Sequence, residues 1–309
     1  MVTAVQIMYG KLVKPDINIR ETYSILTRLG KGGNGTVYLA WQKRLCKFVV
    51  IKIAPKCSSG ELEVCRNEVE AIKNIKSMYI PQVLDFILDD NYSYTIIEYV
   101  EGESFDRLLT AGARFSHSQI IGWYIQLARA LETIHKQDIC HRDIKPSNIM
   151  INKNGNICLI DFNSAYVSSN KTGVVSRSIG YASPEQYEYF KLCKKSFNES
   201  NDVNIVTNET DLLVADCVTE AAPGTGAISG EKSYIDWKLS DIYSLGATIY
   251  HLLIGKRPPV KPEEVVLITM EQGYSKALLT IISKSMMKNP NDRYTSAEQL
   301  REAVQSLKA

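Results

Sequence analysis

Several features are missing from this sequence, and each absence excludes a class of protein. The chain has no run of about 18 uninterrupted apolar residues, and its longest candidate, 245–254, contains His251. The N-terminus has no basic segment followed by an apolar one, so we expect neither a membrane span nor a signal peptide. The seven cysteines form no C-x-x-C pair, which favours a reduced, cytoplasmic compartment over a disulfide framework.

An excess of charge of one sign is also missing. The 36 Lys and Arg residues are balanced by 34 Asp and Glu, for a formal net charge of +2. No overall field therefore attracts nucleic acid or an anionic membrane, and we expect neither as a partner. With 45% hydrophobic and 23% charged residues, the chain has an ordinary globular composition, and 309 residues allow one large domain or two small ones.

The N-terminal third has the pattern of a small β-sheet. Residues 22–55 contain runs rich in β-branched and aromatic side chains, with a glycine-rich turn after the first run, and 93–100 is similar. Between them, 61–76 has apolar residues at roughly helical spacing. We expect a mainly antiparallel sheet with one helix.

After Gly102 the pattern becomes helical. Ser116 and Gln119 predict a capping box ahead of an apolar stripe over 120–134, and Thr295 and Glu298 predict a second near the C-terminus. One stretch differs: 198–236 has eight acidic residues and a single Lys or Arg. Its composition predicts a long acidic excursion that is mobile or weakly structured.

A glycine-rich string, Gly30-Lys-Gly32-Gly-Asn-Gly35-Thr-Val37, lies between two predicted strands. Such glycines let a backbone lie close to phosphates, but they also occur in a plain hairpin or at the start of a dinucleotide-binding unit. The residues that follow continue as a strand rather than a helix, which disfavours dinucleotide binding. The other two interpretations stay open on this string alone.

Lys52 ends an apolar β run, Val49-Val-Ile-Lys52. It is either a solvated strand end or a cation held over phosphates by a carboxylate. Glu68, on the predicted helix, is the natural partner, and Glu70 is its competitor.

The most informative string is His141-Arg-Asp-Ile-Lys-Pro-Ser-Asn148, with Asp161-Phe-Asn163 beginning thirteen residues after Asn148. Two carboxylates and a carboxamide on neighbouring loops offer a base for a hydroxyl proton and oxygen ligands for hard divalent cations. Polar turn residues alone do not explain why the glycine loop, lysine, glutamate and these two strings occur in one order.

In that order the motifs resemble the eukaryotic-type (Hanks-type) serine/threonine protein kinases over about residues 20–305. Ser183-Pro-Glu185 is similar to the end of the family's activation segment, 240–246 to its central buried helix, and Arg293 to the arginine that pairs with Glu185. The amino-acid sequence of 240–259 resembles that of bacterial members of this kinase family.

The resemblance implies an α+β, two-lobed fold. It divides the chain into an N-terminal lead (1–19) and a kinase domain (20–305), with an N-lobe (20–97), a hinge (98–102) and a C-lobe (103–305). The acidic insertion falls at about 188–235. It is either passive or, lying beside the substrate groove, selects basic protein substrates.

The resemblance also implies roles at the phosphoryl group. Asp143 accepts the proton of a Ser or Thr hydroxyl of a protein substrate, and Lys145 neutralises the transferring group. Asn148 and Asp161 hold Mg²⁺, for which Mn²⁺ is a substitute.

For ATP, the resemblance implies that Lys52 binds the α and β phosphates and pairs with Glu68. Ile97 is the gatekeeper before the hinge. The remaining nucleotide-site residues are Leu29, Gly30, Gly32, Gly35, Val37, Val50, Glu98, Val100 and Met150.

Regulation is expected through autophosphorylation of the activation segment, within a homodimer, at Ser168, Ser169, Thr172 and Ser176. Ser178 has the position of a hydroxyl that bridges Asp143 and Lys145.

The sequence departs from the family at three positions. Asn163 stands in place of a glycine, and we expect it to tolerate a positive φ there. Val50 replaces the usual Ala and narrows the adenine slot, and Ser183 replaces Ala.

Two rival functions are a pseudokinase, disfavoured by the intact catalytic residues, and a small-molecule phosphotransferase, disfavoured by Lys145-Pro146 and Ser183-Pro-Glu185.

Overall fold

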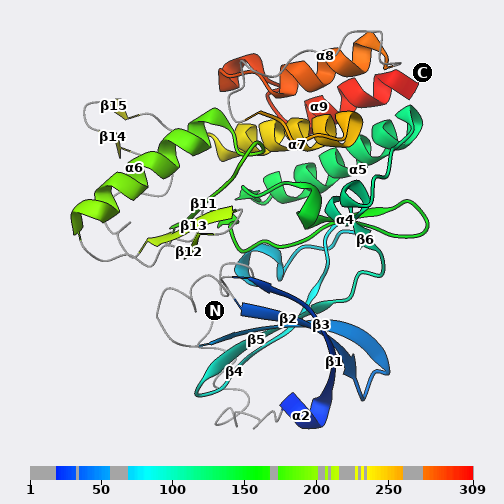
Figure 1. Ribbon diagram of the computed structural model, residues 1–309, viewed down its shortest axis with the longest axis vertical. Coiled ribbons are helices and arrows are strands. Elements are labelled where there is room, and N and C mark those ends of the chain that lie inside the picture. Colours follow the sequence, from blue (N-terminus) through cyan, green and yellow to red (C-terminus); the bar gives the residue numbers. More distant parts are fainter. Residues whose placement is uncertain are drawn as a thin grey trace, which may run out of the picture.

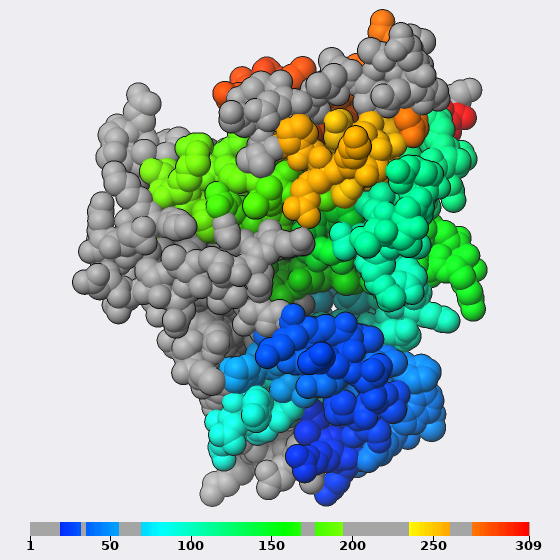
Figure 2. Space-filling view, viewed as in Figure 1, coloured from blue at the N-terminus to red at the C-terminus, as the bar shows by residue number. Residues whose placement is uncertain are grey.

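The computed structural model describes residues 19–32, 35–55, 69–167, 173–200, 206–207, 210–215, 227–228, 231–232, 235–259 and 274–308. These residues form a β-sheet lobe and a helical lobe, which are joined through the segment after β5 (Figure 1). In the space-filling view the two lobes lie directly against each other (Figure 2). The expected α+β, two-lobed fold is therefore confirmed. Among the described helices, none has the length and apolar character that a membrane crossing requires.

A five-stranded antiparallel sheet forms the first lobe, with the spatial order β1-β2-β3-β5-β4. Its strands are β1 (Tyr23–Gly32), β2 (Gly35–Gln42), β3 (Lys47–Pro55), β4 (Val83–Leu88) and β5 (Tyr92–Glu98), preceded by the short helix α2 (Ile19–Thr22). Val49 and Ile51 of β3 are buried in this lobe's small core. Lys52, the next residue, pairs in register with Val37 of β2 and Thr95 of β5.

The helix expected over 61–76 is described only from Val69 onward. Residues 69–72 are helical, and the Lys73 amide donates to the Val69 carbonyl at 2.8 Å. Ile72 and Ile75, two of the expected apolar positions, are buried in the larger core. Residues 61–68 lie outside the described residues.

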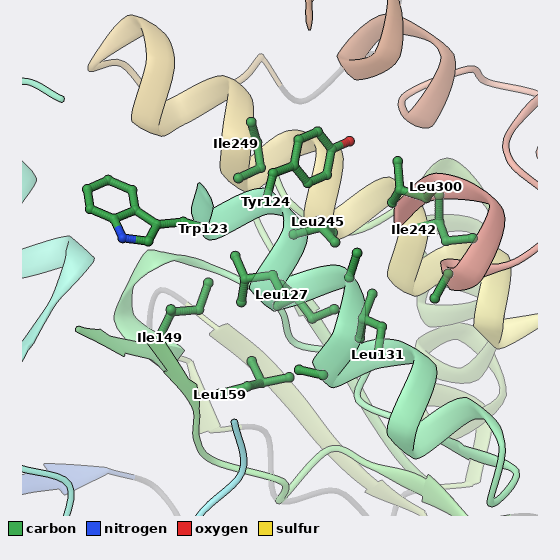
Figure 3. Close-up of a cluster of buried hydrophobic side chains, with 14 of the residues drawn as sticks. Trp123, Tyr124, Leu127, Leu131, Ile149, Leu159, Ile242, Leu245, Ile249 and Leu300 are labelled. Atoms are coloured by element: carbon green, nitrogen blue, oxygen red, sulfur yellow. The ribbon is translucent and has the colours of Figure 1, made fainter. Parts of the chain in front are cut away.

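The second lobe is built around two long helices, α5 (His117–His135) and α7 (Trp237–Ile254). Tyr124, Leu127 and Leu131 of α5 pack toward Leu245 and Ile249 of α7 (Figure 3). The surrounding helices are α4 (Phe105–Thr110), α6 (Pro184–Ser200), α8 (Lys276–Ser285) and α9 (Ala297–Gln305), with 3₁₀ turns η1 (Pro146–Asn148), η4 (Pro290–Asp292) and η5 (Ser306–Lys308). The short strands are β6 (Glu103–Ser104), β7 (Ile139–Cys140), β8 (Ile149–Ile151), β9 (Ile157–Leu159) and β10 (Tyr166–Val167).

Helix caps explain where α5 and α9 begin. The predicted capping box is confirmed at α5, where the Gln119 amide donates to Ser116 Oγ at 3.3 Å and the Ser116 amide donates to Gln119 Oε1 at 2.8 Å. At α9 the prediction was wrong by one residue. Ser296 is the N-cap and accepts from the Gln299 amide at 3.1 Å, so the pair is Ser296 and Gln299 rather than Thr295 and Glu298.

The acidic excursion is more regular than its composition predicts. Helix α6 continues to Ser200, and Phe190, within the predicted insertion, is only 1% exposed. Strand β13 (Thr210–Ala215) pairs antiparallel with β11 (Gly173–Ser178), which precedes α6, and with β12 (Val206–Thr207). A further pair joins β14 (Ala227–Ile228) and β15 (Glu231–Lys232). The expectation of weak structure is wrong for β13, because its backbone pairs with β11, more than thirty residues earlier in the chain.

Candidate active site

Asp241 of α7 fixes the loop that carries Asp143. Its side chain is fully buried, and its carboxylate accepts from the backbone amides of His141 and Arg142, each at 2.8 Å. It also contacts His135 Nε2 at 2.9 Å. Sequence reasoning assigned Asp241 no role, although an acid inside an otherwise apolar helix was a signal for one. The loop before Asp143 is therefore tied to the most buried helix of the lobe.

Arg142 adopts a left-handed backbone conformation, with φ at 62°. Its Nε donates to the Ser164 carbonyl at 2.8 Å, and Gln186 Nε2 donates to the Arg142 carbonyl at 2.8 Å. The guanidinium lies 5.0 Å from the centre of the Trp237 ring. Arg142 thus joins the loop of Asp143 to the residues after Asp161 and to α6.

Asp143 is 7% exposed and lies among hydrogen-bond donors. Ser178 Oγ donates to Asp143 Oδ1 at 2.5 Å, Lys145 Nζ lies 2.9 Å from Oδ2, and Asn148 Nδ2 donates to Oδ2 at 3.0 Å. Burial by itself would raise the pKa of this carboxyl, but the Lys145 cation and the hydrogen bonds from Ser178 and Lys145 outweigh burial and lower the pKa. At neutral pH Asp143 is an ionised hydrogen-bond acceptor.

Ser178 meets both residues that it was expected to bridge. Its hydroxyl oxygen accepts from Lys145 Nζ at 3.0 Å while its proton is donated to Asp143. The structure thereby connects the segment that ends at Glu185 to the loop 141–148.

Lys52 and Asp161 are brought together from the two lobes. Lys52 Nζ lies 3.7 Å from Asp161 Oδ1; the Lys52 side chain is 9% exposed and that of Asp161 is 42% exposed. Asn163 lies between them: Lys52 donates to its amide oxygen, and its amide nitrogen donates to Asp161. Asn163 does not have the positive φ that it was expected to tolerate; the positive φ in this turn, 66°, is at Asp161. Asn163 contributes its side-chain amide instead.

The oxygen donors near Asp143 have the chemistry that a hard divalent cation requires. Asn148 Nδ2 donates to both the Asp143 carbonyl, at 2.8 Å, and the Asp143 carboxylate. Its amide oxygen is therefore the atom that could bind a cation, together with the half-exposed Asp161 carboxylate. The residues fit a magnesium ion by donor type.

Gly35 and Gly30 of the glycine-rich string differ in how much space they leave for a side chain. Gly35 has φ at 127°, and a Cβ there would lie 2.4 Å from the Ile53 carbonyl oxygen, so only glycine fits. A Cβ at Gly30 would meet nothing within 4 Å. Gly32 ends β1, and residues 33–34 lie outside the described residues.

The other predicted nucleotide-site residues lie along the sheet and at the lobe junction. Val50 pairs in register with Ile97, and the Glu98 amide donates to the Gln82 carbonyl at 2.9 Å. Leu29 is 51% exposed on β1, while Val37, Val100 and Met150 are partly buried. A hollow of about 680 Å³ is lined by residues 98–101 together with residues from 76–82 and 152–158, and neither Lys52 nor Asp143 belongs to its lining.

Several predicted residues cannot be located. Glu68, Ser168, Ser169 and Thr172 lie outside the described residues, and Ser176 is described only as a backbone position in β11. Glu70, the competing carboxylate, forms an ion pair with Lys73 at 2.6 Å.

Glu185 and Arg293 form a two-point ion pair. Arg293 Nη1 lies 2.6 Å from Glu185 Oε1 and Nη2 lies 2.8 Å from Oε2. The guanidinium also donates to the carbonyls of Leu239, Met287 and Lys288. This pair fastens the start of α6 to the C-terminal helices.

Tyr181 is anchored to α7 through His251. The Tyr181 hydroxyl lies 2.6 Å from His251 Nδ1. Burial, and then the neighbouring Arg257 cation, lower the pKa of His251 to about 4. The histidine is therefore neutral in the folded chain at pH values where an unfolded chain is protonated, because the ordinary pKa is about 6.5.

This difference predicts a pH dependence of stability. Below about pH 6.5 the unfolded state binds a proton that the folded state does not, so the free energy of unfolding should fall as the pH falls from 6.5 to 4. Urea denaturation of His251→Gln should give a shallower fall over this window. Above pH 7 the imidazole is neutral in both the folded and the unfolded state, so the free energy of unfolding of the wild type and of His251→Gln should change with pH at the same rate. The same rate of change below pH 6.5 would contradict the lowered pKa of His251.

Comparison with known proteins gives the family. The family description "Protein kinase domain" matches residues 23–203. The probable serine/threonine-protein kinase CPE1738 of Clostridium perfringens is 27% identical over 320 residues, which cover 97% of this chain and 39% of that protein. PrkC of Bacillus subtilis is 28% identical, covering 91% and 40%, and mouse Nek1 is 28% identical, covering 88% and 20%.

These relatives confirm the expected resemblance to serine/threonine kinases, bacterial ones included. The chain spans about two fifths of the length of the bacterial relatives. The matched segment is more than half of the chain and carries the glycine-rich string, Lys52, the loop 141–148 and Asp161. The chain therefore belongs to the protein kinase family.

Proposed function

We propose that this chain is an ATP-dependent protein serine/threonine kinase, which transfers the γ-phosphoryl group to Ser and Thr hydroxyls of proteins. The observation that carries the proposal is the ionised Asp143 surrounded by Lys145, Asn148 and Ser178. A carboxylate in this state can accept a hydroxyl proton, and an adjacent cation can neutralise the charge on a phosphoryl group.

The other groups have complementary tasks. Lys52 holds the α and β phosphates, and Glu68 is its proposed partner. Asn148 and Asp161 are the proposed ligands for Mg²⁺, with Mn²⁺ as a substitute, and the bound ion would neutralise phosphate charge. The nucleotide would lie between the residues of β1, β2 and β3 and Met150, with its base at the hinge.

Substrate class rests on the same loop. Lys145 and Ser178 connect Asp143 to the segment that ends at Glu185, which is where we propose that a protein substrate binds. Autophosphorylation at Ser168, Ser169, Thr172 and Ser176, within a homodimer, is part of the proposal. We also propose that the chain is cytoplasmic and that its kinase domain spans residues 20–305.

The direct test is incubation of the purified chain with γ-labelled ATP and Mg²⁺, with and without a generic protein such as casein. Transfer to Ser or Thr is expected. Binding of ATP without any transfer would instead identify a pseudokinase, and transfer only to small molecules would identify the other rival function.

Replacing Asp161 with Ala tests the metal site. The affinity for ATP in the presence of Mg²⁺ should fall at least about tenfold, because a charged oxygen ligand of the ion is lost. Without Mg²⁺ the two chains should bind ATP about equally. Calorimetric titrations in both conditions measure this, with Asp106→Ala, an exposed acid on α4, as the matched control. An unchanged affinity with Mg²⁺ would remove Asp161 from the metal site.

A further inference from the structure

Arg142, the residue before Asp143, carries its charge into the interior of the helical lobe. It is 5% exposed, and burial lowers the pKa of its guanidinium, because a cation loses its hydration there. An arginine nevertheless stays protonated in a protein. A buried cation is unfavourable unless the groups around it stabilise the charge. The neighbours of this guanidinium therefore determine where the Arg142 side chain lies.

The backbone of Arg142 also depends on contacts from distant parts of the chain. Its left-handed conformation, with φ at 62°, is unfavourable for a residue with a Cβ atom and persists only where other contacts hold it. The Arg142 amide donates to Asp241 Oδ1 at 2.8 Å, and its carbonyl accepts from Gln186 Nε2 at 2.8 Å. Because Asp143 follows directly, a movement of Arg142 moves the carboxylate that we propose as the proton acceptor.

Trp237, the first residue of α7, contacts the side chain of Arg142. The centre of its ring lies 5.0 Å from the guanidinium carbon, and the centre of the Tyr166 ring, on β10, lies 5.9 Å away. A cation within about 6 Å of a ring centre is attracted to the ring face, most strongly for tryptophan. Arg142 and Trp237 are both buried, so water screens this attraction little. Trp237 is therefore the stronger of the two aromatic contacts.

Trp237 and Asp241 lie on the same face of α7. They are four residues apart, which is about one turn of an α-helix. Asp241 accepts from the Arg142 amide, whereas Trp237 contacts the Arg142 guanidinium. The Trp237 ring is itself supported by Tyr189 of α6, whose ring centre is 5.4 Å away at an interplanar angle of 82°. One turn of α7 thus holds both the backbone and the side chain of the residue before Asp143.

We propose that Trp237 is a positioning residue for phosphoryl transfer, because its ring holds the Arg142 cation and through it the loop that carries Asp143. The proposal rests on the kinase function proposed above. Replacing Trp237 with Leu removes the aromatic face but keeps an apolar side chain. We expect kcat for casein to fall about tenfold, since the attraction of a desolvated cation to a Trp ring is of that order. Trp237→Phe, which keeps an aromatic face, should lose less.

Two comparisons distinguish positioning from structural support alone. The first is Trp123→Leu, the same replacement at another buried Trp of this lobe (Figure 3). The Trp123 ring packs against those of Phe105 and Phe115, with centres 4.8 and 5.0 Å away, so the variant should lose stability without a fall in the kcat of the folded chain. The second is Trp237→Leu in an Arg142→Met background. There kcat should fall no further, because the ring acts only through the guanidinium.

A second measurement does not require activity. The amides of His141 and Arg142, which donate to Asp241, exchange their hydrogens with solvent only when the loop opens. In Trp237→Leu, hydrogen exchange of the full chain, followed by mass spectrometry, should be about tenfold faster over 141–148 relative to the amides of α8. Trp123→Leu should leave this ratio unchanged. If Trp237→Leu fails to fold, Trp237→Met removes the same aromatic face and takes its place in both measurements.

Each other outcome counts against a defined statement. A wild-type kcat in Trp237→Leu refutes the positioning role and leaves the kinase function standing. An equal fall of kcat in the Arg142→Met background shows that Trp237 does not act through the cation. If the wild type transfers phosphate to no acceptor, the kinase function is overturned, and hydrogen exchange still tests the contact separately. Unchanged exchange over 141–148 in Trp237→Leu refutes the statement that Trp237 holds this loop.

Discussion

Replacing Asp143 with Asn is expected to lower the rate of phosphoryl transfer about 10²- to 10⁴-fold, the usual contribution of a general base. The amide has the shape of the carboxylate but cannot accept a proton. The affinity for ATP should be nearly unchanged, because the proposed phosphate and metal contacts come from Lys52, Asn148 and Asp161. The rate is measured by label incorporation into casein, and the affinity by titration with Mg·ATP.

The matched control is Asp90→Asn, which makes the same chemical change in the exposed turn between β4 and β5. It should transfer phosphate at the wild-type rate. Undiminished transfer by Asp143→Asn would exclude Asp143 as the base. A loss of ATP affinity equal to the loss of rate would instead make Asp143 a binding residue.

The sequence predicts best those features that depend on neighbouring residues. The capping box of α5 needs only Ser116 and Gln119, three positions apart, and the apolar stripe that follows is buried as expected. The strands of the first lobe follow from short runs of β-branched residues. The insertion was misjudged because its apolar run, Leu212 to Val214, finds its partner strand more than thirty residues earlier in the chain. Composition carries no information about such a pairing.

In the candidate site, too, the features set by neighbouring residues were predicted and those that depend on distant residues were not. Asp143, Lys145 and Asn148 are predicted by one string, because the loop 141–148 brings them together locally. Asp241 was missed because its hydrogen bonds reach back about a hundred positions, to His141 and Arg142. For Asn163, the residue type suggested a backbone role, whereas the left-handed conformation is at Asp161 and the Asn163 amide contacts Lys52. A one-dimensional pattern cannot distinguish these two uses of asparagine.

The largest expected effect on stability is at Arg293. Its side chain is fully buried, while that of Glu185 is 16% exposed. Replacement by Met keeps the apolar length of the side chain but leaves the Glu185 carboxylate and the Leu239, Met287 and Lys288 carbonyls without the guanidinium. Breaking a buried ion pair on one side costs about 3–5 kcal/mol. We expect Arg293→Met to lower the free energy of unfolding by that amount.

Urea denaturation measures the loss as a lower midpoint at an unchanged slope. Lys191→Met is the matched control, because Lys191 and Glu188 form an ion pair on the exposed side of α6, with side chains 61% and 65% exposed. Exposed pairs contribute about 0–1 kcal/mol, since water and salt screen them. The double variant Arg293→Met with Glu185→Gln should recover part of the stability, because the buried carboxylate is then neutral. If Arg293→Met had the same urea midpoint as the wild type, the ion pair between Arg293 and Glu185 would not contribute to the stability of the fold.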